Sequence, residues 1–328
     1  MIVDETSMVD ILLMEALLRA LKPDCRLILV GDADQLPSVG AGNVLDDIMG
    51  CGFMLVSRLT EIYRQEGTSR IVVNAHRINR GEMPLLNEKG TDFFFDREEN
   101  IQLAAEKISE LVTQRLPRFL KMRTTNEIMR NIQVLAPAKK GDCGVWALNA
   151  RLQQALNPSD PGKPEIRYGE TVFRLGDKVI QTKNDYQITW RRKATAGWES
   201  GRGIFNGDIG FIIHADEEEH TFTVLFDEEK EVAYQVADME NLELAYCLSI
   251  HKSQGSEFPV VIIPVVNGPR MLLTRNLFYT ALTRAMRHVV LVGRREVIRQ
   301  MVENDAVIHR YTSLRERLRL FGEVLKLC

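Results

Sequence analysis

The sequence predicts an α/β fold with parallel sheets and a small β-rich insert, and two patterns support this prediction. Short apolar runs, beginning with Met1–Val3, alternate with longer segments whose apolar residues recur at helical spacing. This alternation is typical of parallel strands joined by crossover helices. From Tyr168 to Leu242 the chain instead shows short β-type runs divided by turns, without a helical pattern between them. Such a stretch predicts an antiparallel barrel or sandwich.

The other elements follow from local periodicity in chain order. A helix is expected in "SMVDILLMEALLRAL", a buried strand in "CRLILVGD", and an amphipathic helix between residues 98 and 116. A strand in "NIQVLAPA" precedes a helix in "GVWALNARLQQALNP", which Pro158 stops. After the insert, the strands "PVVIIPVV" and "HVVLVG" flank the helix "NLFYTALTRAM".

Composition favours an ordinary cytoplasmic protein. Of the 328 residues, 45% are hydrophobic and 27% are charged, which excludes the disordered and fibrous classes. The formal net charge of -3 gives no overall positive field, although the arginine-rich C-terminal part can carry a locally basic surface. The five cysteines lack metal-ligand spacing and are expected to be reduced thiols. No apolar stretch reaches membrane-span length, and no signal-peptide pattern follows Met1.

Acidic and amide side chains follow the first two predicted strands. Asp4 and Glu5 end the first apolar run, and the turn Gly31–Gln35 ends the second. At the carboxyl end of a parallel sheet, one carboxylate can hold Mg²⁺ while the other orients an attacking water. The amide of Gln35 can contact a terminal phosphate. Either motif alone occurs by chance in many strands, but the two motifs separated by one strand–helix–strand interval are specific.

Three later motifs carry further polar groups. Arg64 in "LTEIYRQ" can bind phosphate oxygens, or it can be a surface arginine paired with a neighbouring glutamate. The polar loop His251–Glu257, between two apolar strands, has the donors needed to hold a phosphate backbone. Arg284 lies on the helix that also carries Tyr279 and Thr280. It can stabilise charge on a transferred phosphoryl group, or it can simply favour the helix dipole.

The motifs "VDETSMVD", "GDADQLP", "YRQ", "HKSQGSEF" and "YTALTRA", in this order, resemble the later conserved motifs of superfamily 1 helicases. Together with "IFNGDIG" and "VLAPAKKGDCGVWALNARLQ", they are most similar to the superfamily 1B, RecD-type branch, the exodeoxyribonuclease V alpha-chain relatives. The resemblance covers nearly the whole chain.

The resemblance implies a fold of RecA-like P-loop NTPase motor domains, each a parallel sheet with helices on both faces. Residues 1–58 would be the C-terminal remnant of a truncated first motor domain. Residues 59–167 and 243–328 would form the second motor domain, and residues 168–242 a small SH3-like β-barrel insert. The implied activity is ATP-dependent 5′–3′ movement on single-stranded DNA.

The resemblance also assigns residues to ATP and Mg²⁺. Asp4 and Glu5 match the motif that serves Mg²⁺ and water activation, and Gln35 matches the glutamine that contacts the γ-phosphate. Arg64 and Arg284 match arginines that reach phosphate from the second domain. The remaining matches are the nucleotide-proximal residues Gly255 and Glu257. The candidate DNA contacts are Lys139, Lys140, Asn206, His251, Lys252 and Ser253.

The sequence departs from the family by lacking a phosphate loop of the form G-x-x-x-x-G-K-[ST]. Its only "GK", Gly162–Lys163, has Asn157 in place of the first glycine and Pro164 in place of the hydroxyl. We therefore expect a C-terminal part of a motor that is inactive alone, with other recombination or repair proteins as possible partners of the parent. The alternative is a non-catalytic DNA- or protein-binding module derived from a helicase. A motor of the relaxase or phage type is a weaker rival.

Overall fold

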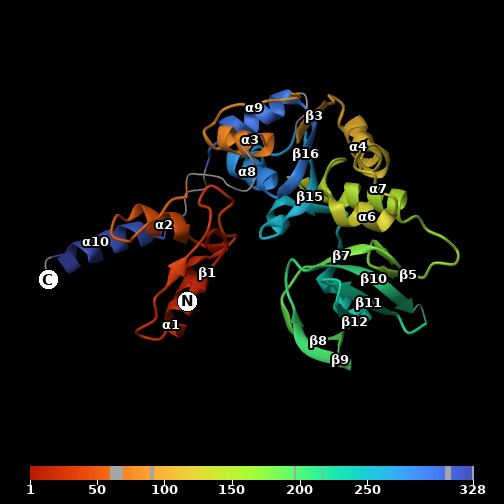
Figure 1. The fold of residues 1–328 in the computed structure, drawn as a ribbon, viewed down its shortest axis with the longest axis horizontal. Coiled ribbons are helices and arrows are strands. Elements are labelled where there is room, and N and C mark those ends of the chain that lie inside the picture. Colours follow the sequence, from red (N-terminus) through yellow and green to blue (C-terminus); the bar gives the residue numbers. More distant parts are fainter. Residues whose placement is uncertain (60–68, 89–91, 196, 217, 307–311, 327–328) are drawn as a thin grey trace. The chain divides into compact units, whose positions relative to one another are not determined.

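The computed structural model describes residues 1–59, 69–88, 92–195, 197–216, 218–306 and 312–326. The chain forms two compact units (Figure 1). Unit 1 comprises Met1–Asp92, Pro269–Thr283 and Ile298–Cys328, and unit 2 comprises Phe93–Gly268 and Arg284–Val297.

Unit 1 contains a short parallel pair of strands and several helices. Strands β1 (Ile2–Val3) and β2 (Ile28–Leu29) pair in register. The small core of this unit is built on Val9, Met14 and Val44. The helices assigned wholly to unit 1 are α1 (Ile11–Ala20), α2 (Val44–Gly50), α3 (Arg70–Asn79), α8 (Arg275–Thr283) and α10 (Leu314–Lys326). Helix α9 (Arg295–Glu303) runs across the boundary between the units.

Unit 2 contains a parallel five-stranded sheet in the order β14-β4-β15-β16-β3. The central strands β4 and β15 are almost entirely buried, as expected for a parallel sheet covered on both faces. The strand bounds are β3 (Phe93–Arg97), β4 (Ile132–Ala136), β14 (Cys247–Ser249), β15 (Phe258–Val265) and β16 (Ala285–Gly293).

Helices of unit 2 share the sheet's hydrophobic core, which includes Ile108, Leu148 and Ile262. Asn100 caps the first of these helices by accepting hydrogen bonds from the Gln102 and Leu103 amides. The helices are α4 (Ile101–Glu110), the π-helical η2 (Leu111–Arg115), α5 (Leu116–Leu120), α6 (Thr125–Asn131) and α7 (Val145–Leu156). Among the described residues of both units, no helix combines the length and apolarity needed to cross a bilayer.

The predicted β-rich stretch forms an antiparallel seven-stranded sheet in the order β13-β7-β10-β11-β12-β8-β9, drawn in green to teal in Figure 1. Its inner face holds a separate core that includes Phe173, Val224 and Tyr234. The strands are β7 (Lys178–Gln181), β8 (Asp185–Ala194), β9 (Gly197–Ile204), β10 (Ile209–Asp216), β11 (Thr221–Phe226), β12 (Lys230–Tyr234) and β13 (Leu242–Leu244). The hairpin β5 (Glu165–Tyr168) and β6 (Thr171–Arg174) precedes them.

Three expected elements differ in extent from the sequence prediction. The strand expected in "CRLILVGD" is reduced to Ile28–Leu29. The helix expected through Met286 ends at Thr283, because β16 begins two residues later. The amphipathic helix between residues 98 and 116 begins at Ile101 and contains a π-helical turn. In each case neighbouring strands and helices set boundaries that local periodicity does not show.

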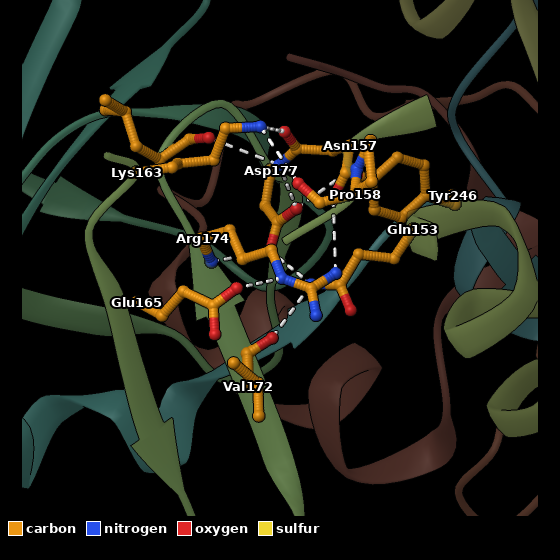
Figure 2. Close-up of polar contacts among 10 residues, drawn as sticks. Gln153, Asn157, Pro158, Lys163, Glu165, Val172, Arg174, Asp177 and Tyr246 are labelled. Atoms are coloured by element: carbon orange, nitrogen blue, oxygen red, sulfur yellow. Dashed lines mark hydrogen bonds and ion pairs between the residues drawn. The ribbon is translucent and has the colours of Figure 1, made fainter. Parts of the chain in front are cut away.

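A buried carboxylate joins the antiparallel sheet to the α/β layer of unit 2 (Figure 2). Asp177 precedes β7 and is fully buried. Its Oδ1 accepts hydrogen bonds from Asn157 Nδ2 at 2.6 Å and Tyr246 Oη at 2.7 Å. Its Oδ2 accepts from Gln153 Nε2 at 2.6 Å and the Arg174 amide at 2.8 Å. Burial raises the pKa of Asp177, and these four donors oppose the rise.

The next residue, Lys178, is inserted on the other side of β7. Its Nζ donates to the Met129 carbonyl at 2.7 Å and to Gln133 Oε1 at 2.8 Å, and it lies 5.8 Å from the centre of the Phe258 ring. Complete burial and, to a smaller extent, the positive charge of Arg130 together lower the pKa of Lys178 to about 7. A neutral amine still has two hydrogens, which is enough for both acceptors.

We predict that Asp177→Asn destabilises the protein by about 2–3 kcal/mol, because an amide NH₂ would face groups that also donate. Urea unfolding followed by circular dichroism measures this loss. Glu170→Gln removes one negative charge from an exposed position in the turn between β5 and β6 and serves as the control. Equal stability of the two variants would contradict the role given to Asp177.

We predict that the stability of the wild type relative to Lys178→Met rises with pH between about 7 and 10. In this range the buried lysine is neutral while the unfolded chain still binds the proton, so the unfolded state holds more protons and higher pH favours folding. The expected slope is about 1 kcal/mol per pH unit in urea unfolding. Lys183→Met, at an exposed position, is the control. A difference that does not change with pH would rule out the effect.

Candidate nucleotide and nucleic-acid sites

The pairing of β1 and β2 brings the polar residues after both strands to one end of the pair. The Val30 amide donates to the Val3 carbonyl, and the Thr6 amide donates back to the Val30 carbonyl. Asp4 is exposed, and its Oδ1 accepts the Glu5 amide at 2.8 Å. Glu5 has φ 50° and ψ 38°, the left-handed region that residues with a Cβ seldom adopt. Such strain often marks a functional position.

The turn after β2 is held by a shared carboxylate. Asp32 Oδ2 accepts from Gln35 Nε2 at 3.3 Å and from Tyr279 Oη at 2.9 Å. Gln35 is 8% exposed, so its amide is largely withdrawn from solvent in this conformation. Gly31 lies against the segment that follows Asp4 and Glu5, because a Cβ at Gly31 would be 3.0 Å from the Thr6 nitrogen. The two predicted motifs are therefore packed together.

Helix α8 provides the acceptor for the next amide of this turn. The Leu36 amide donates to Thr280 Oγ1 at 2.8 Å, and both groups are buried. Sequence reasoning placed Tyr279 and Thr280 on this helix but gave them no partner. The contacts join residues 244 positions apart in the chain, which no local pattern reveals.

In unit 2, Arg284 lies beside the loop that contains Gly255 and Glu257. Its side chain is nearly buried, and Nη1 donates to the Ser256 carbonyl at 3.3 Å. The Phe258 amide donates to the Arg284 carbonyl, which ties the starts of β15 and β16 together. Gly255 has φ +77° and open space around its Cβ position, so the backbone conformation, and not crowding, favours glycine there. These residues lie at the amino ends of the parallel strands.

Two of the predicted DNA contacts lie at the opposite, carboxyl end of the sheet. Lys139 and Lys140 are exposed in the loop after β4. The ammonium of Lys140 lies 5.9 Å from the centre of the Trp146 ring, which is 55% exposed. The Trp146 amide donates to the Lys139 carbonyl, and Gly144 is packed too closely against this loop to carry a side chain. Sequence reasoning missed Trp146, although an aromatic residue near two lysines was a usable signal.

The segment after β14 starts at the same end. Ser249 pairs with Ala136, so η4 (Ile250–Ser253) begins beside the loop that contains Lys139. His251 is exposed, yet neighbouring atoms partly desolvate its ring and lower its pKa. Lys252 Nζ forms an ion pair with Glu243 Oε2 at 2.8 Å. The hydroxyl of Ser253 is buried and donates to the Ile250 carbonyl at 2.9 Å.

The other two predicted residues lie elsewhere. Asn206 is exposed in the turn between β9 and β10, where its amide donates to Asn184 Oδ1 at 2.9 Å. Arg64 lies outside the described residues. The structure therefore groups the candidates of unit 2 at the two ends of the parallel sheet and places Asn206 on the antiparallel sheet.

Three protein families match successive parts of the chain. Residues 1–101 match the family described as AAA domain. Residues 148–226 match the ATP-dependent RecD-like DNA helicase SH3 domain, and residues 244–292 match the UvrD-like helicase C-terminal domain. The middle match confirms the predicted SH3-like insert.

The chain is 35% identical over 286 residues to the ATP-dependent RecD2 DNA helicase of Deinococcus radiodurans, covering 87% of this chain and 35% of that protein. It is 31% identical over 333 residues to the RecBCD enzyme subunit RecD of Mycolicibacterium smegmatis, covering 98% of this chain and 54% of the relative. The chain thus spans about half or less of the length of these relatives. A crystal structure of Bacteroides Pif1 bound to ssDNA superposes with a TM-score of 0.51 at 16% identity, covering 99% and 75% of the two chains. This likeness supports the predicted RecA-like α/β fold.

We predict that Thr280→Val accelerates hydrogen exchange of the Leu36 amide about tenfold or more, because the buried N–H loses its acceptor at a cost of about 1–3 kcal/mol. Hydrogen–deuterium exchange of the peptide containing Leu36 measures this change. Thr280→Ser keeps the hydroxyl and should retain most of the protection. Equal exchange in the two variants would show that the hydroxyl does not hold the turn.

Proposed function

Because the chain belongs to the RecD-like DNA helicases of superfamily 1, we propose that it is part of an ATP-dependent motor that moves 5′ to 3′ on single-stranded DNA. The observation that carries this proposal is the packing of the two acidic and amide motifs at the ends of β1 and β2. A hydrolytic phosphoryl-transfer site can use carboxylates to hold the metal and a glutamine amide to orient the attacking water.

Within this proposal, Asp4 and Glu5 hold Mg²⁺ and orient the attacking water. Asp4 is exposed, and one of its oxygens accepts the Glu5 amide; an exposed carboxylate suits a cation that keeps several waters and phosphate ligands. The metal would neutralise charge on the phosphates. Gln35 would leave its contact with Asp32 and turn its amide to the terminal phosphate.

From the resemblance, the residues at the amino ends of β15 and β16 are also proposed to serve the nucleotide. Arg284 would stabilise charge on the transferred phosphoryl group, and Gly255 and Glu257 would lie near the nucleotide. Arg64 is proposed for a second phosphate contact from the resemblance alone. The contact between Arg284 and the Ser256 carbonyl fixes the guanidinium against this loop and supports their grouping.

The carboxyl end of the same sheet is proposed to contact DNA. Lys139 and Lys140 would bind phosphates, and the exposed Trp146 ring offers a surface on which a base can stack. His251 lies on the segment that starts at this end, while Lys252 would have to leave Glu243 to bind phosphate. Asn206 would add a contact from the SH3-like insert. Ser253 would act indirectly, by fixing η4.

We propose that these 328 residues do not hydrolyse ATP by themselves. They contain no G-x-x-x-x-G-K-[ST] sequence. The lysine of the only "GK" pair, Lys163, donates to Asn157 Oδ1 and to the Pro158 carbonyl, as Figure 2 shows. Asn157 in turn donates to the buried Asp177. Ile2 and Ile28 are 69% and 53% exposed, although parallel strands are normally covered on both faces. Both strands therefore leave apolar side chains uncovered in this structure.

The alternative is a non-catalytic binding module, which the missing phosphate loop also favours. A RecD-like parent would act in the cytoplasm in DNA repair or recombination, and any nuclease activity would belong to a partner. ATP turnover separates the motor from the module.

We predict no DNA-stimulated ATP turnover for the 328-residue chain, and stimulated turnover once it is joined to the phosphate-loop segment of a RecD-like relative. In the joined protein, Arg284→Ala should lower kcat about a thousandfold or more. Arg284→Lys keeps the charge without the planar fork, and it tests whether charge alone suffices. Turnover by the 328-residue chain would disprove its inactivity. A small effect of Arg284→Ala would remove that arginine from the reaction.

A further inference from the structure

The hairpin formed by β8 and β9 presents one face to solvent. Opposed residues of an antiparallel pair share a face, and the register opposes Thr189 to Arg202, Arg191 to Ser200, and Lys193 to Trp198. All six residues are exposed. We call them the outer face of the ribbon. Trp190 lies between Thr189 and Arg191 in β8, so its side chain is on the opposite, inner face, where it packs against the core of the antiparallel sheet.

The outer face of the ribbon is basic. It carries Arg191, Lys193 and Arg202, and the one acidic residue opposed to it from β12 is Glu231. Glu231 Oε2 contacts Arg191 Nε at 2.9 Å, but the Arg191 side chain remains 64% exposed, so this pair is weak. Among the described residues, neither Lys193 nor Arg202 has an ion-pair partner.

The inner face differs in charge. Arg192 is the arginine of that face, and it forms ion pairs with Glu199 at 2.8 Å and Glu229 at 3.3 Å. Acidic residues of the insert therefore neutralise the inner arginine, whereas among the described residues Lys193 and Arg202 of the outer face have no acidic partner. This asymmetry is what an anionic ligand of the outer face requires.

An aromatic ring lies within the same basic surface. Trp198 is 59% exposed, and the Arg191 guanidinium lies 5.0 Å from the centre of its ring. The guanidinium limits the motion of the indole and leaves much of it in contact with water. An exposed indole next to cations is the combination that binds a nucleotide, with a base on the ring and phosphate on the charges.

A second exposed aromatic site lies at the base of the ribbon. Tyr186 and Phe205 are 64% and 44% exposed, and their rings meet edge to face with centres 5.7 Å apart. Asn206, a predicted DNA contact, follows directly in the chain. From Tyr186 to Lys193, opposite Trp198, the strand extends roughly 23 Å. The ribbon therefore separates two aromatic sites by a length that an extended single strand can follow.

We propose that the outer face of the ribbon binds single-stranded nucleic acid. Lys193, Arg202 and Arg191 contact phosphates, and an unpaired base stacks on Trp198. Stacking on this ring favours a single strand over a duplex, whose bases are already stacked on each other, and over an acidic peptide, which lacks planar bases. The inference rests on the proposed function for its ligand class. The outer face of the ribbon is a different surface from the proposed nucleotide site and from the proposed DNA contacts at the carboxyl end of the parallel sheet.

The test is fluorescence anisotropy of a fluorescein-labelled oligodeoxythymidylate titrated with the full chain over a range of salt concentrations. Lys193→Ala with Arg202→Ala should weaken binding and reduce the slope of log K against log salt by about 1.4, the value for two lost phosphate contacts on a single strand. Trp198→Ala should weaken binding about tenfold at constant slope. Trp198→Phe keeps an aromatic face and should retain most of the affinity.

A charge-matched control is Arg118→Ala with Arg123→Ala, which removes two exposed arginines from around α5. This control should keep the wild-type salt slope. Ribbon variants that bind like the wild type would overturn the inference while leaving the proposed function intact. A wild-type chain that does not bind the oligonucleotide would overturn both. Equal dependence on Trp198 for a duplex or for polyglutamate would overturn the assignment to single strands.

Discussion

The arrangement of unit 2 depends on two consecutive buried residues of opposite charge. Asp177 inserts between the end of α7 and Tyr246, and Lys178 inserts between α6 and β4. Because successive side chains of a strand point to opposite sides, β7 binds the α/β layer on both sides at once. Each group is costly to bury and has partners only in this geometry. The pair therefore specifies one position of the insert relative to the parallel sheet.

This constraint has a functional consequence for the sites in unit 2. Lys139, Trp146 and the ribbon that carries Trp198 belong to elements joined through the same buried contacts. A nucleic acid that binds both the loop with Lys139 and the outer face of the ribbon would find these two surfaces at a fixed distance from each other. A rigid arrangement reduces the entropy lost when a flexible strand binds at several points. The insert would thus act as a fixed extension of the sheet and not as a swinging arm.

Local periodicity was sufficient to predict much of the fold. The apolar runs of β4 and β15, the helix α7 and the antiparallel insert all follow from spacing and turns. It could not show that Asp177 and Lys178 are buried, because charged residues after a glycine look like an exposed turn. Nor could it pair Leu36 with Thr280 or place Arg284 outside its helix, since both depend on contacts distant in sequence.

The segment between β14 and β15 links the two ends of the parallel sheet. It starts where Ser249 pairs with Ala136 and ends where Phe258 pairs with Ala285. The Ser249 hydroxyl caps η4, and the Ser256 carbonyl accepts from Arg284. A shift of Arg284 toward a phosphate would break or strain its hydrogen bond to Ser256, which lies three residues after the end of η4. If Arg284 serves the proposed nucleotide site and His251 the proposed DNA contact, this short segment is the backbone that connects the two.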